Sequence, residues 1–123
     1  MSYDTSIIDP DTGAELADLG NMTSNVGAIY RRAMPGPYEG GGRYNGVGEP
    51  EPQSGLPGLS GLRCRDAAPI LRAGVQVMLA EGDAMIAMEP DNGWGSYAGA
   101  LVYLCSILFA CADYPDGVLA VSW

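Results

Sequence analysis

Alternation of apolar and polar side chains predicts a β-hairpin near the start of the chain. Tyr3, Thr5 and Ile7 alternate with polar residues, and residues 9–13 supply the proline and glycine of a turn. Residues 14–19 then form the returning strand. Asp9 and Asp11 belong to this turn rather than to a calcium loop, since no closing glutamate follows at the required spacing.

A short helix is predicted over Val26–Met34. Thr23, Ser24 and Asn25 precede it and are all competent N-caps, and Pro35 ends it. Capping accounts for one of these three side chains. The polar cluster is therefore open to a second interpretation, as part of a small binding site.

A longer helix is predicted from Asp66, the expected N-cap, to Gly82, the expected end, with Pro69 in its first turn. Helical spacing places one set of apolar residues toward the core and polar residues away from it. The inward set is Ile70, Leu71, Gly74, Val77 and Met78, and the outward residues are Arg72 and Gln76.

The last helix is expected after a turn at residues 89–95, and no residue between Asn92 and Ala112 is charged. Its acidic flanks and small polar residues argue against a membrane span. The spacing predicts two faces, both covered by neighbours. The bulky face comprises Trp94, Tyr97, Leu101, Leu104, Cys105 and Leu108, and the small-residue face comprises Gly95, Gly99, Ser106 and Ala110. We expect a homo-oligomer through the small-residue face, with a sheet or the preceding helix as the alternative neighbour.

These elements predict one α+β domain over residues 1–123. Residues 118–123 form a strand that joins the hairpin in a small antiparallel sheet, packed by two long helices and one short helix. Pro35–Leu62 interrupts the pattern with nine glycines and five prolines in 28 residues. This segment is either a flexible insertion or a binding loop, in which Arg43 and Tyr44 offer contacts.

The charge inventory excludes several classes of function. The chain has 15 acidic residues and six arginines, no lysine and no histidine, and a net charge of −9. Such a surface repels nucleic acid phosphates and suits a basic protein surface as partner. Without histidine or lysine, histidine-dependent nucleophiles and Schiff-base chemistry are excluded. Carboxylate pairs remain, Asp9 with Asp11 and Glu89 with Asp91, but turn formation explains both. We expect no catalysis, no cofactor and no metal.

Three cysteines indicate a reducing compartment. Cys64, Cys105 and Cys111 have no metal-like spacing. Cys105 and Cys111 point in different directions on one helix, so they do not bond to each other. With no apolar leader at the start, this favours the cytosol.

Several short segments, taken in order, carry a family resemblance. They are Tyr3-Asp4, Asp9-Pro10-Asp11-Thr12-Gly13, Asn21-Met22-Thr23-Ser24-Asn25 with Tyr30-Arg31-Arg32-Ala33, Gly61-Leu62 before Ala68-Pro69-Ile70-Leu71, Glu89-Pro90 through Asn92-Gly93-Trp94-Gly95, and Pro115-Asp116-Gly117. In this order they resemble small phage and prophage proteins, especially from actinobacterial hosts. That family has no assigned activity, so the resemblance carries over no catalytic residue. The Pro35–Leu62 segment departs from the family pattern.

The resemblance and the acidic surface lead us to expect a phage accessory protein in the host cytosol. It would neutralise a host factor stoichiometrically, by masking a protein or by sequestering a signalling nucleotide. For a nucleotide, the candidate residues are Trp94 and Tyr97 for stacking, Asn21, Thr23 and Asn25 for base edges, Arg31 and Arg32 for phosphates, and Tyr30, Arg43, Tyr44 and Asn92 beside them. The alternative is an oligomeric protein–protein adaptor or assembly module with no small-molecule ligand.

Overall fold

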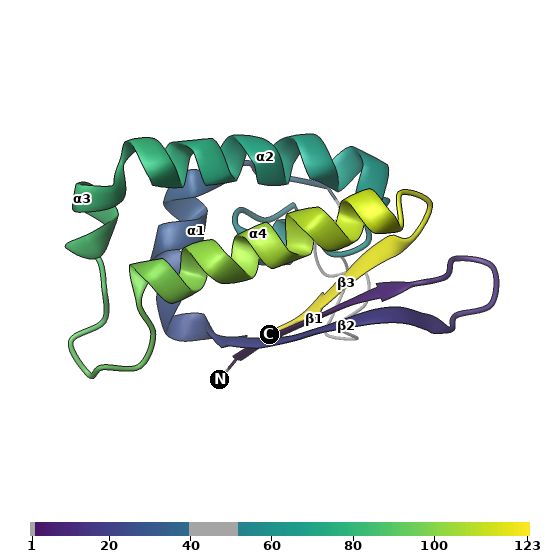
Figure 1. The fold of residues 1–123 in the computed structure, drawn as a ribbon, viewed down its shortest axis with the longest axis horizontal. Coiled ribbons are helices and arrows are strands. Elements are labelled where there is room, and N and C mark those ends of the chain that lie inside the picture. Colours follow the sequence, from purple (N-terminus) through teal and green to yellow (C-terminus); the bar gives the residue numbers. More distant parts are fainter. Residues whose placement is uncertain (1, 40–51) are drawn as a thin grey trace.

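The chain builds a three-stranded sheet with helices on one side of it (Figure 1). The computed structural model describes residues 2–39 and 52–123, so the candidates Arg43 and Tyr44 lie outside the described residues. The elements in chain order are β1 (Ser2–Ile8), β2 (Glu15–Thr23), a 3₁₀ turn η1 (Ser24–Val26), α1 (Gly27–Ala33), a second 3₁₀ turn η2 (Leu56–Leu59), α2 (Cys64–Ala80), α3 (Gly82–Ile86), α4 (Tyr97–Asp113) and β3 (Val118–Ser122).

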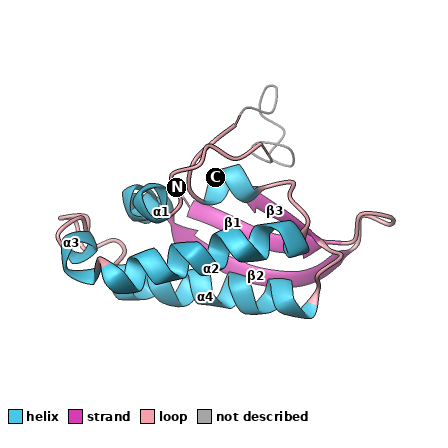
Figure 2. Cartoon of the chain, turned by 90° about the horizontal axis from the view of Figure 1, so that it is seen from above, coloured by secondary structure: helices cyan, strands magenta, loops and turns pink. Residues whose placement is uncertain are grey.

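The sheet has the order β2-β1-β3 and both pairings are antiparallel. Tyr3, Thr5 and Ile7 of β1 are buried, as the alternating pattern predicts, and Leu119 and Val121 of β3 are buried with them. Helices α2 and α4 pack against each other on this side of the sheet (Figure 2). The expected α+β architecture, with an N-terminal hairpin and a C-terminal third strand, is confirmed.

Strand β2 is longer than expected. It runs to Thr23 rather than ending at Leu19, and its register against β1 shifts between the pairs Asp4↔Asn21 and Ser6↔Asp18. Gly20 has φ +73° at this shift, a backbone conformation that glycine adopts without strain. The irregularity allows the strand to continue into the polar cluster that the sequence suggested was a turn.

The predicted N-cap of the long helix is wrong. Helix α2 begins at Cys64, and Asp66 lies in its first turn, so Pro69 falls in the second turn. The cause is tertiary: the backbone N–H of Cys64 donates to the Gly117 carbonyl (2.8 Å) and that of Arg65 to the Pro115 carbonyl (3.0 Å). A loop far along the chain thus caps the helix in place of a side chain. The helix ends at Ala80, and Gly82 begins α3, a short helix that was not predicted.

The inward face of α2 agrees well with its apolar spacing. Leu71, Gly74 and Met78 are buried, whereas Ile70 and Val77 are only partly so. Arg72 and Gln76 point outward as expected. Gly74 is needed for close packing, because a Cβ there would lie 2.8 Å from Cγ of Met34.

The predicted faces of α4 need correction. The buried line runs between them, and comprises Ala100, Tyr103, Leu104, Ile107 and Cys111. Gly95 precedes the helix, which begins at Tyr97 after the N-cap Ser96. A Cβ at Gly99 would lie 3.7 Å from Cε of Met22, so the small-residue flank meets strand β2. No residue of the helix before Asp113 is charged, and apolar residues occur on all its sides, so its periodicity alone does not select the core side.

Three tyrosine hydroxyls fix α4 to its neighbours. Tyr30 of α1 donates to the Ala100 carbonyl (2.8 Å), Tyr97 donates to the Met78 carbonyl of α2 (2.5 Å), and Tyr103 donates to the Gly20 carbonyl of β2 (3.0 Å). Each ring fills apolar space while its polar end finds an acceptor. Together they hold α4 against α1, α2 and the sheet.

Part of the Pro35–Leu62 segment belongs to the core. Leu56 and Leu59 are fully buried, and Tyr38 and Gln53 exchange two backbone hydrogen bonds. Beyond η2, the Gly61 N–H donates to the Leu119 carbonyl (2.7 Å), which extends the pairing at the free edge of β3. The interpretation as a flexible insertion is therefore wrong for residues 52–62. In the part of the chain that the structure describes, no helix is long and apolar enough to cross a membrane.

Candidate functional site

Four residues predicted from the sequence as ligand-binding gather around one hollow. Asn21, Thr23, Asn25 and Trp94, together with Ser2, line a depression of about 500 Å³, here called the Trp94 hollow. Ser2 and Thr23 are register partners on β1 and β2. Their side chains lie on the face of the sheet opposite the buried Tyr3, and Trp94 reaches them from the loop before α4.

The position of Trp94 depends on the glycine that follows it. Gly95 has φ +101°, and a Cβ there would lie 2.7 Å from Thr23 Cγ2 and 2.8 Å from Val26 Cγ1. Only glycine allows this loop to approach the end of β2 so closely. On the other side, the Trp94 backbone N–H donates to Asn92 Oδ1 (2.9 Å), so Asn92 shapes the turn. The indole itself remains 69% exposed at the rim of the hollow.

The polar cluster both caps a turn and lines the hollow. Thr23 Oγ1 accepts the backbone N–H of Asn25 (3.3 Å) and so caps η1. The same Thr23 lines the hollow beside Asn21 and Asn25. The cluster therefore contributes amide and hydroxyl groups to a surface depression while starting the turn into α1.

The other candidate residues of the described chain lie elsewhere. Tyr30 is fully buried, and its burial raises the pKa of its phenol well above the ordinary value. Tyr97 bonds to α2, as described above. Arg32 pairs with Glu81, with Nη2 2.6 Å from Oε1. Arg31 is exposed on α1, with its guanidinium near Gly27 and the Tyr3 hydroxyl.

The positions of Arg31 and Arg32 determine which kind of ligand the hollow can bind. None of the described residues that line the Trp94 hollow is charged. Of the two arginines expected to hold phosphates, Arg32 pairs with Glu81. Arg31 lies close enough to Tyr3 to offset part of the pKa rise that burial imposes on that phenol. The lining suits uncharged hydrogen-bonding groups next to an aromatic or apolar one.

An acidic surface adjoins the hollow on the same face of the sheet. Asp4, Glu15 and Asp18 line a shallow depression of about 380 Å³, here called the acidic sheet face. Asp4 is the register partner of Asn21, so this face continues directly into the Trp94 hollow. Helices α2 and α4 cover the opposite face of the sheet (Figure 2).

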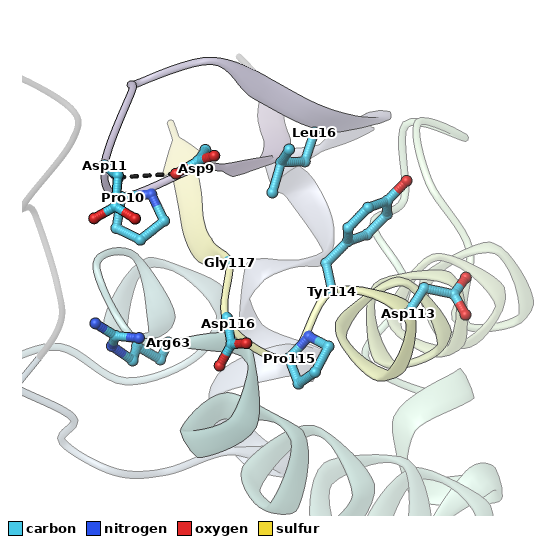
Figure 3. Close-up of a pocket in the computed structure, with 10 residues that line it drawn as sticks. All are labelled: Asp9, Pro10, Asp11, Leu16, Arg63, Asp113, Tyr114, Pro115, Asp116 and Gly117. Carbon is cyan, nitrogen blue, oxygen red and sulfur yellow. Dashed lines mark hydrogen bonds between the residues drawn. The ribbon is translucent and has the colours of Figure 1, made fainter.

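A third depression, of about 480 Å³, was missed by sequence reasoning. Residues 9–11 of the hairpin turn meet residues 113–117 there, with Leu16 beside Tyr114 and Arg63 at the opposite end (Figure 3). Both turns were predicted, but nothing in their sequences shows that they meet. Asp9 Oδ1 accepts the Asp11 N–H (2.8 Å), and Asp116 pairs with Arg65, so these carboxylates already have structural partners.

The carboxylate pairs considered for catalysis also serve the backbone. Asp9 shapes its turn, and Glu89 Oε1 accepts the Tyr97 N–H (2.8 Å) at the start of α4. Among residues 2–39 and 52–123, no cluster of three or more cysteine, aspartate or glutamate side chains is arranged to hold a metal ion. No family model, curated protein or solved structure matches the chain.

Proposed function

We propose that this protein is a phage accessory protein that binds a basic surface of a host protein stoichiometrically and so masks it. The observation that carries the proposal is the continuity of the Trp94 hollow with the acidic sheet face. An exposed tryptophan beside hydrogen-bonding groups is typical of the residues that dominate binding energy at interfaces. Neighbouring carboxylates steer a basic partner toward it.

A protein target fits this surface better than a nucleotide does. Sequestering a nucleotide requires cations for its phosphates, and the described lining of the hollow supplies none. Asp4 lies next to Asn21 and would repel a phosphate bound there. A lysine- or arginine-bearing loop would instead place its cations on Asp4 and Asp18 and its apolar side chains on Trp94.

The family resemblance of the short segments supports the phage origin and the host cytosol as the site of action. The net charge of −9 is consistent with binding to a basic protein surface.

The second candidate is an oligomeric adaptor. It is favoured by a separate observation, a stripe of exposed apolar side chains on α4.

Native mass spectrometry of the tagged protein, taken directly from an actinobacterial lysate, tests the proposal. We expect a complex with one host protein per chain. Trp94→Ala should abolish it, and Asp4→Asn with Asp18→Asn should weaken it and reduce its dependence on salt. Leu79→Ala and Asp83→Asn are the matched controls, since both residues are exposed on α2 and α3, away from the sheet.

Three other results of the mass spectrometry experiment would contradict or change the proposal. A retained nucleotide that Trp94→Ala releases would replace protein masking with nucleotide sequestration. A host complex that survives both sets of substitutions would place recognition on another surface. A chain with neither partner nor ligand would contradict stoichiometric binding in that host.

A further inference from the structure

Helix α4 carries a second apolar stripe, on the side opposite the core. Ala98, Val102, Cys105, Phe109 and Ala112 follow one another at intervals of four, three, four and three residues. Val102 is 66% exposed and Phe109 71% exposed. Ala98 and Ala112 are exposed as well, and Cys105 is partly so.

This spacing is the seam of a coiled coil. A repeat averaging 3.5 residues keeps a stripe facing one partner helix along its whole length. The core of this chain is already packed by the other side of α4, through Tyr103, Leu104 and Ile107. The outer stripe therefore has no packing role within the described fold, yet it exposes two large apolar side chains to water.

The charge distribution indicates what covers the stripe. The chain has a net charge of −9, but no residue from Asn92 to Ala112 is charged. Two copies of such an acidic protein repel each other where their carboxylates meet, and this helix surface is free of that repulsion. A basic partner would find no carboxylate on the stripe to pair with. The surface thus fits another copy of the same chain.

We propose that the protein forms a two-fold symmetric homodimer in which two α4 helices pack antiparallel along this stripe. With the axis near Cys105, Ala98 lies opposite the partner's Ala112, and Val102 lies opposite the partner's Phe109. Each contact then occurs twice, as two-fold symmetry requires. The antiparallel arrangement also separates the two copies of Asp113 at the helix ends, which a parallel one would bring together.

The dimer does not depend on the proposed function. The acidic sheet face lies on the side of the sheet that α4 does not cover (Figure 2), so the stripe is no part of it. The stripe also differs from the interface expected from the sequence. Gly99 and Ala110 of the small-residue face are half-buried against the rest of the molecule, and Ser106 is the member of that face that is exposed on the helix.

Sedimentation equilibrium over a range of protein concentrations tests the dimer. We expect Phe109→Glu to raise the dissociation constant by about a hundredfold or more, because a carboxylate would be buried without a partner. Leu79→Glu is the control, since Leu79 is 64% exposed on α2 and the charge change is the same. Circular dichroism of both variants checks that they are folded. A monomer at all concentrations, or a dimer indifferent to Phe109→Glu, would overturn the proposal.

Disulfide cross-linking tests the register. Diamide oxidises two thiols to one disulfide and takes up their two hydrogens. Cys105 is the most accessible thiol, because Cys64 and Cys111 are buried. We expect a covalent dimer that Cys105→Ser abolishes. In the Cys105→Ser background, a mixture of Ala98→Cys and Ala112→Cys chains should form the mixed dimer. Cross-linking of Ala98→Cys chains only to themselves would show parallel helices and contradict the antiparallel arrangement.

Discussion

At the scale of single residues, Gly95 has the largest influence on the candidate site. Its positive φ and its contact with Thr23 and Val26 bring the loop against the end of β2. Gly93, two residues earlier, also has a positive φ, of +75°, but a Cβ there would meet nothing within 4 Å. The two glycines therefore share a positive φ and differ in the contacts that a Cβ would make.

This pair provides a matched test of the site's geometry. Gly93→Ala should cost about 1 kcal/mol from backbone strain alone. Gly95→Ala should cost about 2–3 kcal/mol, since the same strain is joined by overlap with Thr23 and Val26. Urea unfolding of both variants gives the two free energies, and quenching of tryptophan fluorescence reports whether Trp94 has moved. Equal losses would show that the close contact at Gly95 has no energetic consequence.

At the scale of elements, buried tyrosines connect α4 to the rest of the fold. Burial raises the pKa of Tyr3, Tyr30 and Tyr103 above their ordinary value, which is about 10. In the unfolded chain these phenols ionise near pH 10, whereas the folded protein keeps them protonated. The stabilisation is fully present below pH 10 and is lost as the pH rises further.

We therefore predict a sharp alkaline loss of stability. With no histidine or lysine in the chain, the unfolding free energy should change little between about pH 6 and 8. Above about pH 10 it should fall by about 1.4 kcal/mol per pH unit for each buried tyrosine. Urea titrations at a series of pH values measure this slope. Tyr30→Phe should make it shallower, and an unchanged slope would exclude Tyr30 as a source.

The elements also show what can be predicted from sequence and what cannot. Alternation identified β1, which has one buried side, and the third strand was recognised as a β-rich run after a turn. The start of α2 was missed, because carbonyls of residues 115 and 117 cap it across the fold. The core side of α4 was missed, because no residue of the helix before Asp113 is charged and apolar residues occur on all its sides. The convergence of Asn21 and Trp94 was foreseen only as a possibility, since no local signal reports contact between the hairpin and a loop about 70 residues away.

At the scale of the whole molecule, negative charge dominates the surface. The net charge of −9 opposes compaction, and salt screens this repulsion over about 10 Å at 0.1 M. The exposed ion pairs Arg32–Glu81 and Arg65–Asp116 are weakened by the same salt, but each contributes less than about 1 kcal/mol.

Because the repulsion among the carboxylates outweighs these two ion pairs, we predict that moderate salt stabilises the fold. The urea midpoint should rise between about 10 mM and 200 mM sodium chloride. Potassium chloride should act in the same way, since screening depends on ionic strength and not on the identity of the cation. A fall in the midpoint would show that the two ion pairs outweigh the repulsion among the carboxylates.

The sheet order has a consequence for synthesis on the ribosome. β1 is the central strand, and it can pair with β2 as soon as the hairpin has emerged. Its other neighbour, β3, is made after all the other described elements, and the segment just before it supplies the carbonyls that cap α2. Neither the sheet nor the helix start can be completed before β3 has been made. Nascent chains should therefore stay open to proteases until β3 has left the exit tunnel, and then become resistant in a single late step.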